Sequence, residues 1–374
     1  MKRIVFILLV FCGFSKSYAQ FDLETQMGEI GKAIPSYYYA YTKNIFSNVG
    51  QPIIMGNQIQ HWKKDWKIKY GLSFSGQFLN NDTWGTGGIE FTELYQSPNI
   101  SYLGNLSDAF GSEEASFIRH YLLDNNGNKI VNPLTGEYLS TDIEMAGGLG
   151  RGLTTIPYVL PSIELKIWKG ISIAGSYLPV SWFLREFEED NFKTSVNMYS
   201  IGAGLTLREF TDIPVLSWLR FDASMSGVNA SFSELQDALD LEPTEFFNLD
   251  LTQFELGTSI RTNQFRGTLA IPVMPKKNII LLAQAGYYTH TYSFNFDYNI
   301  DVEVDAEQLK EDYNIEFEGQ EFSIGDTYSQ SEQIDNTFYY SGGLLIDSQI
   351  STFYLGYAQF RYPTLCLRAS IKLL

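Results

Sequence analysis

The segment YTHTYSFNFDYNIDVEV, residues 288–304, alternates apolar and polar side chains without a break. Aromatic and aliphatic side chains take every second position, and Thr, Ser, Asn, Asp and Glu take most of the positions between them. A period of two predicts a β-strand with one apolar and one polar face. At about 3.3 Å per residue the strand is roughly 56 Å long, about three times the usual length in soluble proteins. Its apolar face therefore needs a long apolar partner.

The first nineteen residues have the three parts of a secretory signal peptide. Lys2 and Arg3 form a basic start, residues 4–14 form an apolar run, and the motif SYA at 17–19 is a small-residue cleavage site. The apolar run is too short to span a bilayer. We therefore expect residues 1–19 to be removed on secretion.

The composition narrows the class of protein. The 374 residues include 24 Tyr, 27 Phe and 31 Gly. Cleavage would leave 23 of the 26 basic residues beside all 43 acidic ones, a net charge of about −20. This balance argues against nucleic acid as a partner, because phosphate binding needs a basic surface. Cys366 would be the one cysteine left, so the fold has to form without an intrachain disulfide.

Further segments repeat the period of two. The ten strands that we expect lie at residues 66–78, 162–168, 171–180, 196–210, 219–229, 249–274, 279–304, 337–346, 351–360 and 364–374. The connections of this series alternate between short turns and three long acidic loops, at 181–195, 230–248 and 305–336, except that the last outer turn, at 361–363, is also short. Outer-membrane barrels sort their connections in this way, with short turns in the periplasm and long loops outside. In a soluble β-sandwich, long and short connections are not expected to be sorted to opposite ends.

We therefore predict an all-β fold, a transmembrane antiparallel β-barrel of about 10–14 strands with long acidic extracellular loops, in the outer membrane of a Gram-negative bacterium. The barrel is expected over residues 63–374. Residues 20–62 are not strand-like and are expected to form a short helix and loops, as a plug or a periplasmic segment. Residues 79–157 contain one further hairpin with an Asn-Gly turn.

The strand at 66–78 suggests which side chains face lipid and which face the lumen. Trp66 and Phe78 stand where membrane-interface residues belong, and Lys67 and Lys69 would point into the lumen with Arg266 nearby. A lumen of this kind is ordinarily polar, and an anion-selective filter is the more specific alternative.

The hairpin formed by 249–274 and 279–304 is longer than a membrane-spanning strand requires. If its two arms are symmetric about the turn, Phe265 lies on the same face as Tyr288. The outer part of the hairpin carries an aromatic surface that needs cover, and this surface is our candidate ligand or partner site: Tyr288, Tyr292, Phe294, Phe296 and Tyr298. Facing outward it would be a stacking surface, and facing inward it would line an apolar ligand site.

The sequence gives little support for a catalytic or a metal-binding site. The three histidines, His61, His120 and His290, are far apart, and Ser293 lies on the opposite strand face from His290, so we expect no enzyme and no cofactor. A calcium loop beginning at Asp124 lacks its bidentate Glu. The acidic segment 305–336 is expected to be a solvated loop. The alternative is that divalent ions, of an identity the sequence does not specify, bridge its carboxylates to lipopolysaccharide phosphates.

Three stretches carry a resemblance to a known class: LPSIELKIWKGISIAGSYLPV (160–180), DIPVLSWLRFDASMSG (212–227) and MPKKNIILLAQAGYYT (274–289). In these stretches the chain resembles outer-membrane β-barrels of the long-chain fatty-acid transporter type, and an uncharacterised family of barrels with signal peptides. The resemblance implies passive uptake or binding of a small apolar molecule, and it supplies no functional residue.

Two functions therefore remain open. The first is passive uptake or binding of a small apolar molecule. The second is a non-transporting scaffold that presents the long aromatic hairpin to a partner. The expected partners are outer-membrane lipid and lipopolysaccharide, a small apolar ligand, or a surface or secretion protein.

Overall fold

The computed structural model describes most of the chain, in the following ranges: 23–56, 66–78, 89–104, 106, 114, 116–124, 126–132, 135–145, 155–180, 193–233, 247–274, 278–305, 307, 310–311, 321–360 and 363–373. The expected signal peptide at 1–19 and His61 lie outside these residues.

Ten antiparallel strands form a closed barrel in the order β1-β13-β12-β11-β10-β9-β8-β7-β6-β5, and β5 pairs with β1 to complete the ring. They are β1 (Ile68–Phe78), β5 (Thr155–Trp168), β6 (Ile171–Pro179), β7 (Lys193–Thr206), β8 (Leu219–Ser233), β9 (Phe247–Met274), β10 (Ile279–Val304), β11 (Glu321–Asp347), β12 (Ser351–Gln359) and β13 (Pro363–Leu373). Each overlaps one of the ten expected strands. The predicted antiparallel barrel is confirmed.

The segment between β1 and β5 carries a separate antiparallel sheet. Its strands are β2 (Ile100–Gly104), β3 (Ser116–Tyr121) and β4 (Ser140–Met145), in the order β2-β3-β4, preceded by the short helix η2 (Phe91–Glu93). The expected turn is present at Gly127, which has a φ of 79° and lies between the bridged residues Leu123 and Lys129. None of these described residues joins the barrel.

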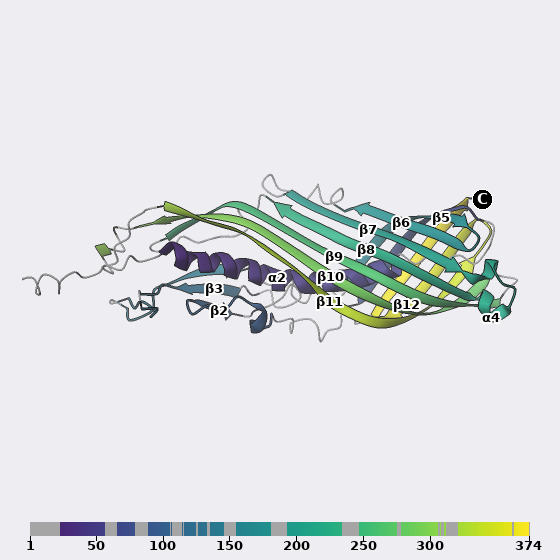
Figure 1. Ribbon diagram of the computed structural model, residues 1–374, viewed down its shortest axis with the longest axis horizontal. Helices are drawn as coiled ribbons and strands as arrows, with labels where there is room; N and C mark the ends of the chain where they lie inside the picture. Colours follow the sequence, from purple (N-terminus) through teal and green to yellow (C-terminus); the bar gives the residue numbers. More distant parts are fainter. Residues whose placement is uncertain are drawn as a thin grey trace, which may run out of the picture.

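Strands β9, β10 and β11 have 28, 26 and 27 residues, whereas the other barrel strands have between 9 and 15. Strand β11 begins at Glu321, so the second half of the segment expected as an acidic loop, 305–336, pairs with β10 instead. Figure 1 shows the three long strands extending far beyond the shorter strands, away from the C-terminus and from helix α4 (Pro214–Ser217), which follows η4 (Leu207–Glu209).

Helix α2 (Leu23–Gly56) is the third part of the molecule. We expected a short helix and loops, but it has 34 residues and is roughly 51 Å long at 1.5 Å per residue. It contacts β1, β5 and β13 on one side of the ring and β8, β9, β10 and β11 on the other, so it lies inside the ring. Towards its N-terminus it runs between the long strands and the β2-β3-β4 sheet (Figure 1). None of the described helices is long and apolar enough to cross a membrane.

The outward face of the barrel is an apolar band between two groups of aromatic side chains. At one end Tyr287 pairs with Phe265 and Phe338 on the neighbouring strands, and Phe338 is 79% exposed. At the other end the exposed rings of Trp168 and Phe210 lie 6.0 Å apart. Exposed leucines fill the space between: Leu281, Leu344, Leu355 and Leu367. This is the surface that hydrocarbon solvates, with aromatic girdles at its two edges.

The register of the strands gives the thickness of this band. On β10 the apolar outward positions run from residue 279 to Tyr287, nine residues. At about 3.3 Å per residue and a tilt of about 40°, nine residues rise about 23 Å, close to the roughly 25 Å of a barrel's apolar band. From Thr289 onward the outward positions of β10 are polar. The outer two thirds of β10 therefore stand outside the band.

Two expectations about the facing of aromatic side chains were wrong. Trp66 was expected at the membrane interface, but it is 1% exposed, because it precedes β1 and has left the alternation of the strand. Phe265 was expected on the face of Tyr288, but it pairs with Tyr287 and faces outward. A bulge at Ile279/Ile280 shifts the pairing by one residue, which moves every later side chain to the other face. The side chain of Phe78 lies outside the described residues.

Candidate functional site

The inward row of β10 is the first candidate site, and helix α2 covers it. Side chains of β10 are buried at every second position from Ile280 to Val304. Tyr292, Phe294, Phe296 and Tyr298 belong to one apolar core with residues of α2 and of the β2-β3-β4 sheet. Of the two orientations open for the aromatic surface, the structure has the inward one.

Tyrosines of α2 make the ring contacts at this interface. Tyr38 stacks on Phe296 with ring centroids 6.0 Å apart, and Tyr39 meets Phe294 edge-on at 5.6 Å. Gly31 allows the closest approach, because a Cβ at this position would lie 2.2 Å from the Tyr298 hydroxyl. The aromatic surface is thus filled by the protein's own helix.

A buried hydrogen bond fixes the register between α2 and β10. The Thr42 hydroxyl lies 2.6 Å from the Tyr292 hydroxyl and 2.6 Å from the Tyr38 carbonyl. The carbonyl can only accept, so Thr42 donates its one proton there and Tyr292 donates to Thr42. Breaking this pair would leave a hydroxyl buried without a partner, which is costly.

Lys43 ties α2 to two further segments. Its ammonium lies 2.6 Å from Glu332 on β11 and 3.0 Å from Glu93, the last residue of η2. One lysine thus joins the helix, the long strands and the segment that carries the small sheet.

The small sheet has its own buried polar pair. His120 on β3 is fully buried, and Asn99 donates from Nδ2 to its Nε2 over 3.1 Å. Desolvation lowers the pKa of His120 to about 4. The neutral imidazole is therefore part of the folded sheet.

A layer of charged side chains lines the end of the barrel where the C-terminus lies. Among the described residues the barrel strands bury five basic side chains and three acidic ones: Lys69, Arg220, Arg266, Arg368 and Lys372, with Glu164, Asp222 and Asp347. Lys69 lies 3.5 Å from Glu164, which is also 4.0 Å from Arg368. Lys372 pairs with Asp347. This layer is the second candidate site.

The predicted site residues divide between these two sites. Tyr288 is buried with Tyr339 and Phe360 in a cluster beside the charged layer, apart from the α2 interface. Lys69 and Arg266 are both buried in the charged layer, but they pair with different acids. The expectation that Lys67 points into the lumen was wrong: it is exposed, because it precedes β1 and lies outside the alternation of that strand.

The other chemical candidates do not assemble a catalytic or metal site among the described residues. His290 is buried, with its Nδ1 2.7 Å from the Thr262 hydroxyl, whereas Ser293 faces outward to Ser331. Asp124 accepts backbone N–H groups from Asn126 and Asn128 in an exposed turn. No described group of three or more His, Cys, Asp or Glu side chains is placed to hold a metal ion.

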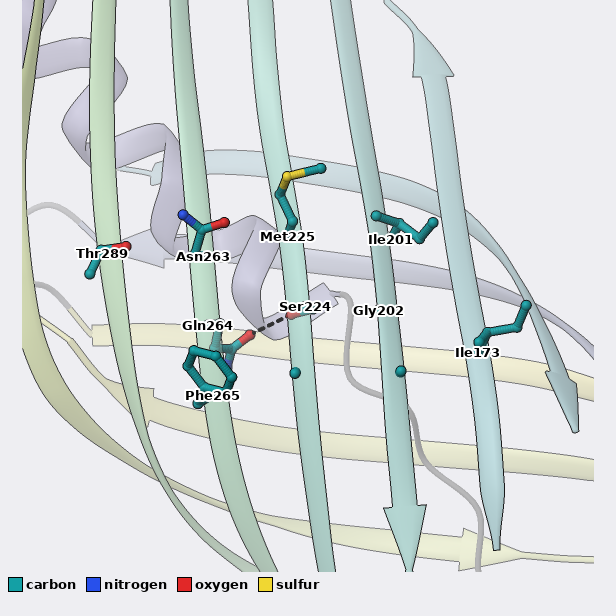
Figure 2. A pocket seen from close by; sticks show the side chains of 11 residues that line it. Ile173, Ile201, Gly202, Ser224, Met225, Asn263, Gln264, Phe265 and Thr289 are labelled. Atoms are coloured by element: carbon teal, nitrogen blue, oxygen red, sulfur yellow. Dashed lines mark hydrogen bonds between the residues drawn. The ribbon is translucent and has the colours of Figure 1, made fainter. Parts of the chain in front are cut away.

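A hollow of about 640 Å³ lies in the outward wall of the barrel. Figure 2 shows Ile201, Met225, Asn263 and Thr289 on four neighbouring strands along it. Small residues, Gly202 among them, form its floor. It lies at the edge of the outward apolar band, because Thr289 and its neighbour Asn263 are the first polar outward positions beyond the aromatic girdle.

Sequence reasoning did not anticipate the acidic members of the charged layer or the role of α2. Asp222 and Glu164 occupy alternate strand positions among small polar residues, which is a usable signal for lumen-facing charge. The tyrosine run at 37–39 in the N-terminal segment was the available signal for an aromatic partner of β10.

Comparisons with known proteins give only distant likenesses. No family model and no curated protein matches the chain. Similar solved structures include the translocator domain of the autotransporter NalP from Neisseria meningitidis, at 8% identity and a TM-score of 0.32, covering 92% of this chain and 99% of that one. The transport unit of the autotransporter AIDA-I from Escherichia coli matches at 8% identity and a TM-score of 0.27, covering 91% and 99%. A mutant of the monoaromatic hydrocarbon channel TodX matches at 9% and 0.19, covering 82% and 90%.

At these scores the likenesses add nothing about residues or activity. They do not specifically support the resemblance to fatty-acid transporters.

Proposed function

We propose that the protein is a non-transporting outer-membrane scaffold. Its barrel would anchor it in the outer membrane, its long strands would stand on the cell surface, and α2 would keep the pore closed. The observation that carries this proposal is the position of α2, which contacts strands on both sides of the ring and fills the aromatic row of β10.

The surface that the scaffold would present is different from the one suggested by the sequence. The aromatic row is buried, so a partner would meet the outward polar face of the long strands or the β2-β3-β4 sheet. Hydrogen-bonded polar pairs cover the outward face of the strands, for example Asn295 with Ser329 and Asn299 with Thr252. A surface or secretion protein or lipopolysaccharide sugar is the kind of partner that such a face suits.

Orientation is the first point to test. Asn295→Cys on the extension and Gln349→Cys in the turn between β11 and β12 place single thiols at opposite ends of the barrel. Cys366 is buried and gives little background. On intact cells a membrane-impermeant maleimide should label Asn295→Cys and should label Gln349→Cys only after the cells are permeabilised. The reverse pattern would refute the proposed orientation.

Pore closure is the second point, and it separates scaffold from uptake. We expect the wild-type barrel in planar bilayers to conduct poorly and liposomes containing it to take up little apolar dye. Lys43→Glu places a carboxylate beside Glu93 and Glu332 and should raise conductance by loosening α2.

Lys32→Glu is the matched control on the same helix, because Lys32 is half exposed and its partners, Glu29 of α2 and the ring of Tyr95, do not lie on barrel strands. It should leave conductance unchanged. A wild-type protein that conducts freely would refute pore closure, and one that admits the dye would instead favour uptake of a small apolar molecule.

A further inference from the structure

The charged layer contains more positive than negative charge at one point, between β8 and β9. Asp222 is the shared acceptor of two guanidinium groups. Its Oδ1 lies 3.0 Å from Arg220 and its Oδ2 lies 2.9 Å from Arg266. The three side chains are nearly buried, with 8% of Asp222 and 4% of Arg266 exposed. One carboxylate thus faces two buried cations, which leaves one positive charge without a counter-charge at this point. A buried uncompensated charge is strongly unfavourable.

The other described acids of the charged layer have basic partners of their own, since Glu164 lies near Lys69 and Arg368 and Asp347 pairs with Lys372. Arg368 on β13 is buried and lies within electrostatic range of both Arg220 and Arg266. The helix that occupies the lumen has no acidic residue after Glu29 in its sequence. Among the described residues the local excess is therefore positive.

An unused donor points to where a counter-ion would bind. Nη1 of Arg266 is buried and has no hydrogen-bond partner among the described residues. Buried polar groups are almost always paired, so an unpaired guanidinium N–H indicates a group that completes the site. A second donor lies directly beside it, because the Tyr339 hydroxyl interacts with the Arg266 guanidinium and also accepts from Gln264 Nε2, which leaves its own proton to donate.

A glycine on β10 allows the Tyr339 hydroxyl to approach Arg266. Tyr339 is on β11, one strand beyond β10, and its ring lies over Gly286, which pairs with Arg266. A Cβ on Gly286 would lie 2.5 Å from the ring. The glycine thus lets the tyrosine reach across β10 to the side chains of β9.

From the charge excess and the two donors we infer that the lumen binds a small oxyanion, of the phosphate or carboxylate class, at Arg266 Nη1 and the Tyr339 hydroxyl. Planar guanidinium groups suit such oxyanions, and low solvent access strengthens the contact. The inference does not depend on the proposed scaffold function.

The test is calorimetric titration of the folded, detergent-solubilised full chain with inorganic phosphate at constant ionic strength, using chloride as the balancing salt. We expect saturable binding of one phosphate per chain. Arg266→Met should weaken it by about tenfold or more, because a charged hydrogen bond is lost. Arg119→Met removes an exposed arginine of the small sheet and should bind phosphate as the wild type does.

Gln264→Glu gives an independent answer should Arg266→Met fail to fold. The new carboxylate lies two residues from Arg266 on the same strand face and would take the place of the anion, so phosphate binding should be lost while the barrel stays folded by circular dichroism. The inference is overturned by wild-type protein that shows no saturable binding, or by Gln264→Glu that binds phosphate with wild-type affinity. Equal weakening by Arg119→Met and Arg266→Met would also overturn it.

Discussion

Truncating Tyr39 to alanine should release α2 from the barrel without altering the barrel itself. Tyr39 is 3% exposed, and its aromatic partners all lie on barrel strands, at 5.5 Å for Tyr292, 5.6 Å for Phe294 and 6.5 Å for Tyr328. These contacts exist only while α2 is docked. Removing a large buried aromatic side chain typically costs about 3–5 kcal/mol. Alanine is the better helix former, so the loss falls on docking and not on the helix.

Hydrogen exchange measures this loss directly. If α2 opens as a unit, a change of about 3–5 kcal/mol speeds exchange of its protected amides roughly a hundredfold to several thousandfold. Tyr138→Ala removes an exposed tyrosine outside the barrel and serves as the matched control. Unchanged protection of α2 in Tyr39→Ala, or an equal loss in Tyr138→Ala, would refute the view that the aromatic row holds the helix in place.

Three further predictions follow from the same contacts. Thr42→Val leaves the Tyr292 hydroxyl buried without its acceptor and should cost about 1–3 kcal/mol in α2 docking, measured by the same exchange experiment. Folding lowers the pKa of His120 to about 4, so as the pH falls the unfolded sheet takes up a proton before the folded sheet does. The stability of the small sheet should therefore drop between about pH 6.5 and 4, by about 3 kcal/mol at most. His120→Gln should remove this pH dependence, measured by hydrogen exchange at a series of pH values. Leu281→Arg in the apolar band should destabilise the barrel in lipid vesicles by about 2–4 kcal/mol, whereas Thr291→Arg beyond the aromatic girdle should cost about 0–1 kcal/mol. Denaturant titration measures both costs, and equal costs would contradict the placement of the band.

The strands could be predicted from the sequence because their signals are local. The alternation of Tyr70, Leu72 and Phe74 with Ser73 and Ser75 assigns the two faces of β1, and the structure exposes the first group and buries the second. Turn residues act locally too, as at Gly170, which has a φ of 63° between β5 and β6.

Register and helix length could not be predicted in the same way. A single bulge beside the turn between β9 and β10 moved Phe265 to the opposite face from Tyr288. Pro272, which pairs with Ile280 at this bulge, was the available signal, but a proline in a strand does not say which way the register shifts. Pro35 and several glycines argued against a long N-terminal helix. Burial of Ile30, Ile34 and Tyr37 in the shared core stabilises it nevertheless.

The sequence by itself determined that the chain forms a ring of antiparallel strands with an apolar exterior, because side-chain alternation and turn residues act over a few positions. Only the tertiary structure decided what fills the inside. The aromatic row of β10 has the same sequence whether lipid, ligand, partner or helix covers it. The cover is α2, more than 240 residues away along the chain, and such a contact depends on how the whole barrel closes around it.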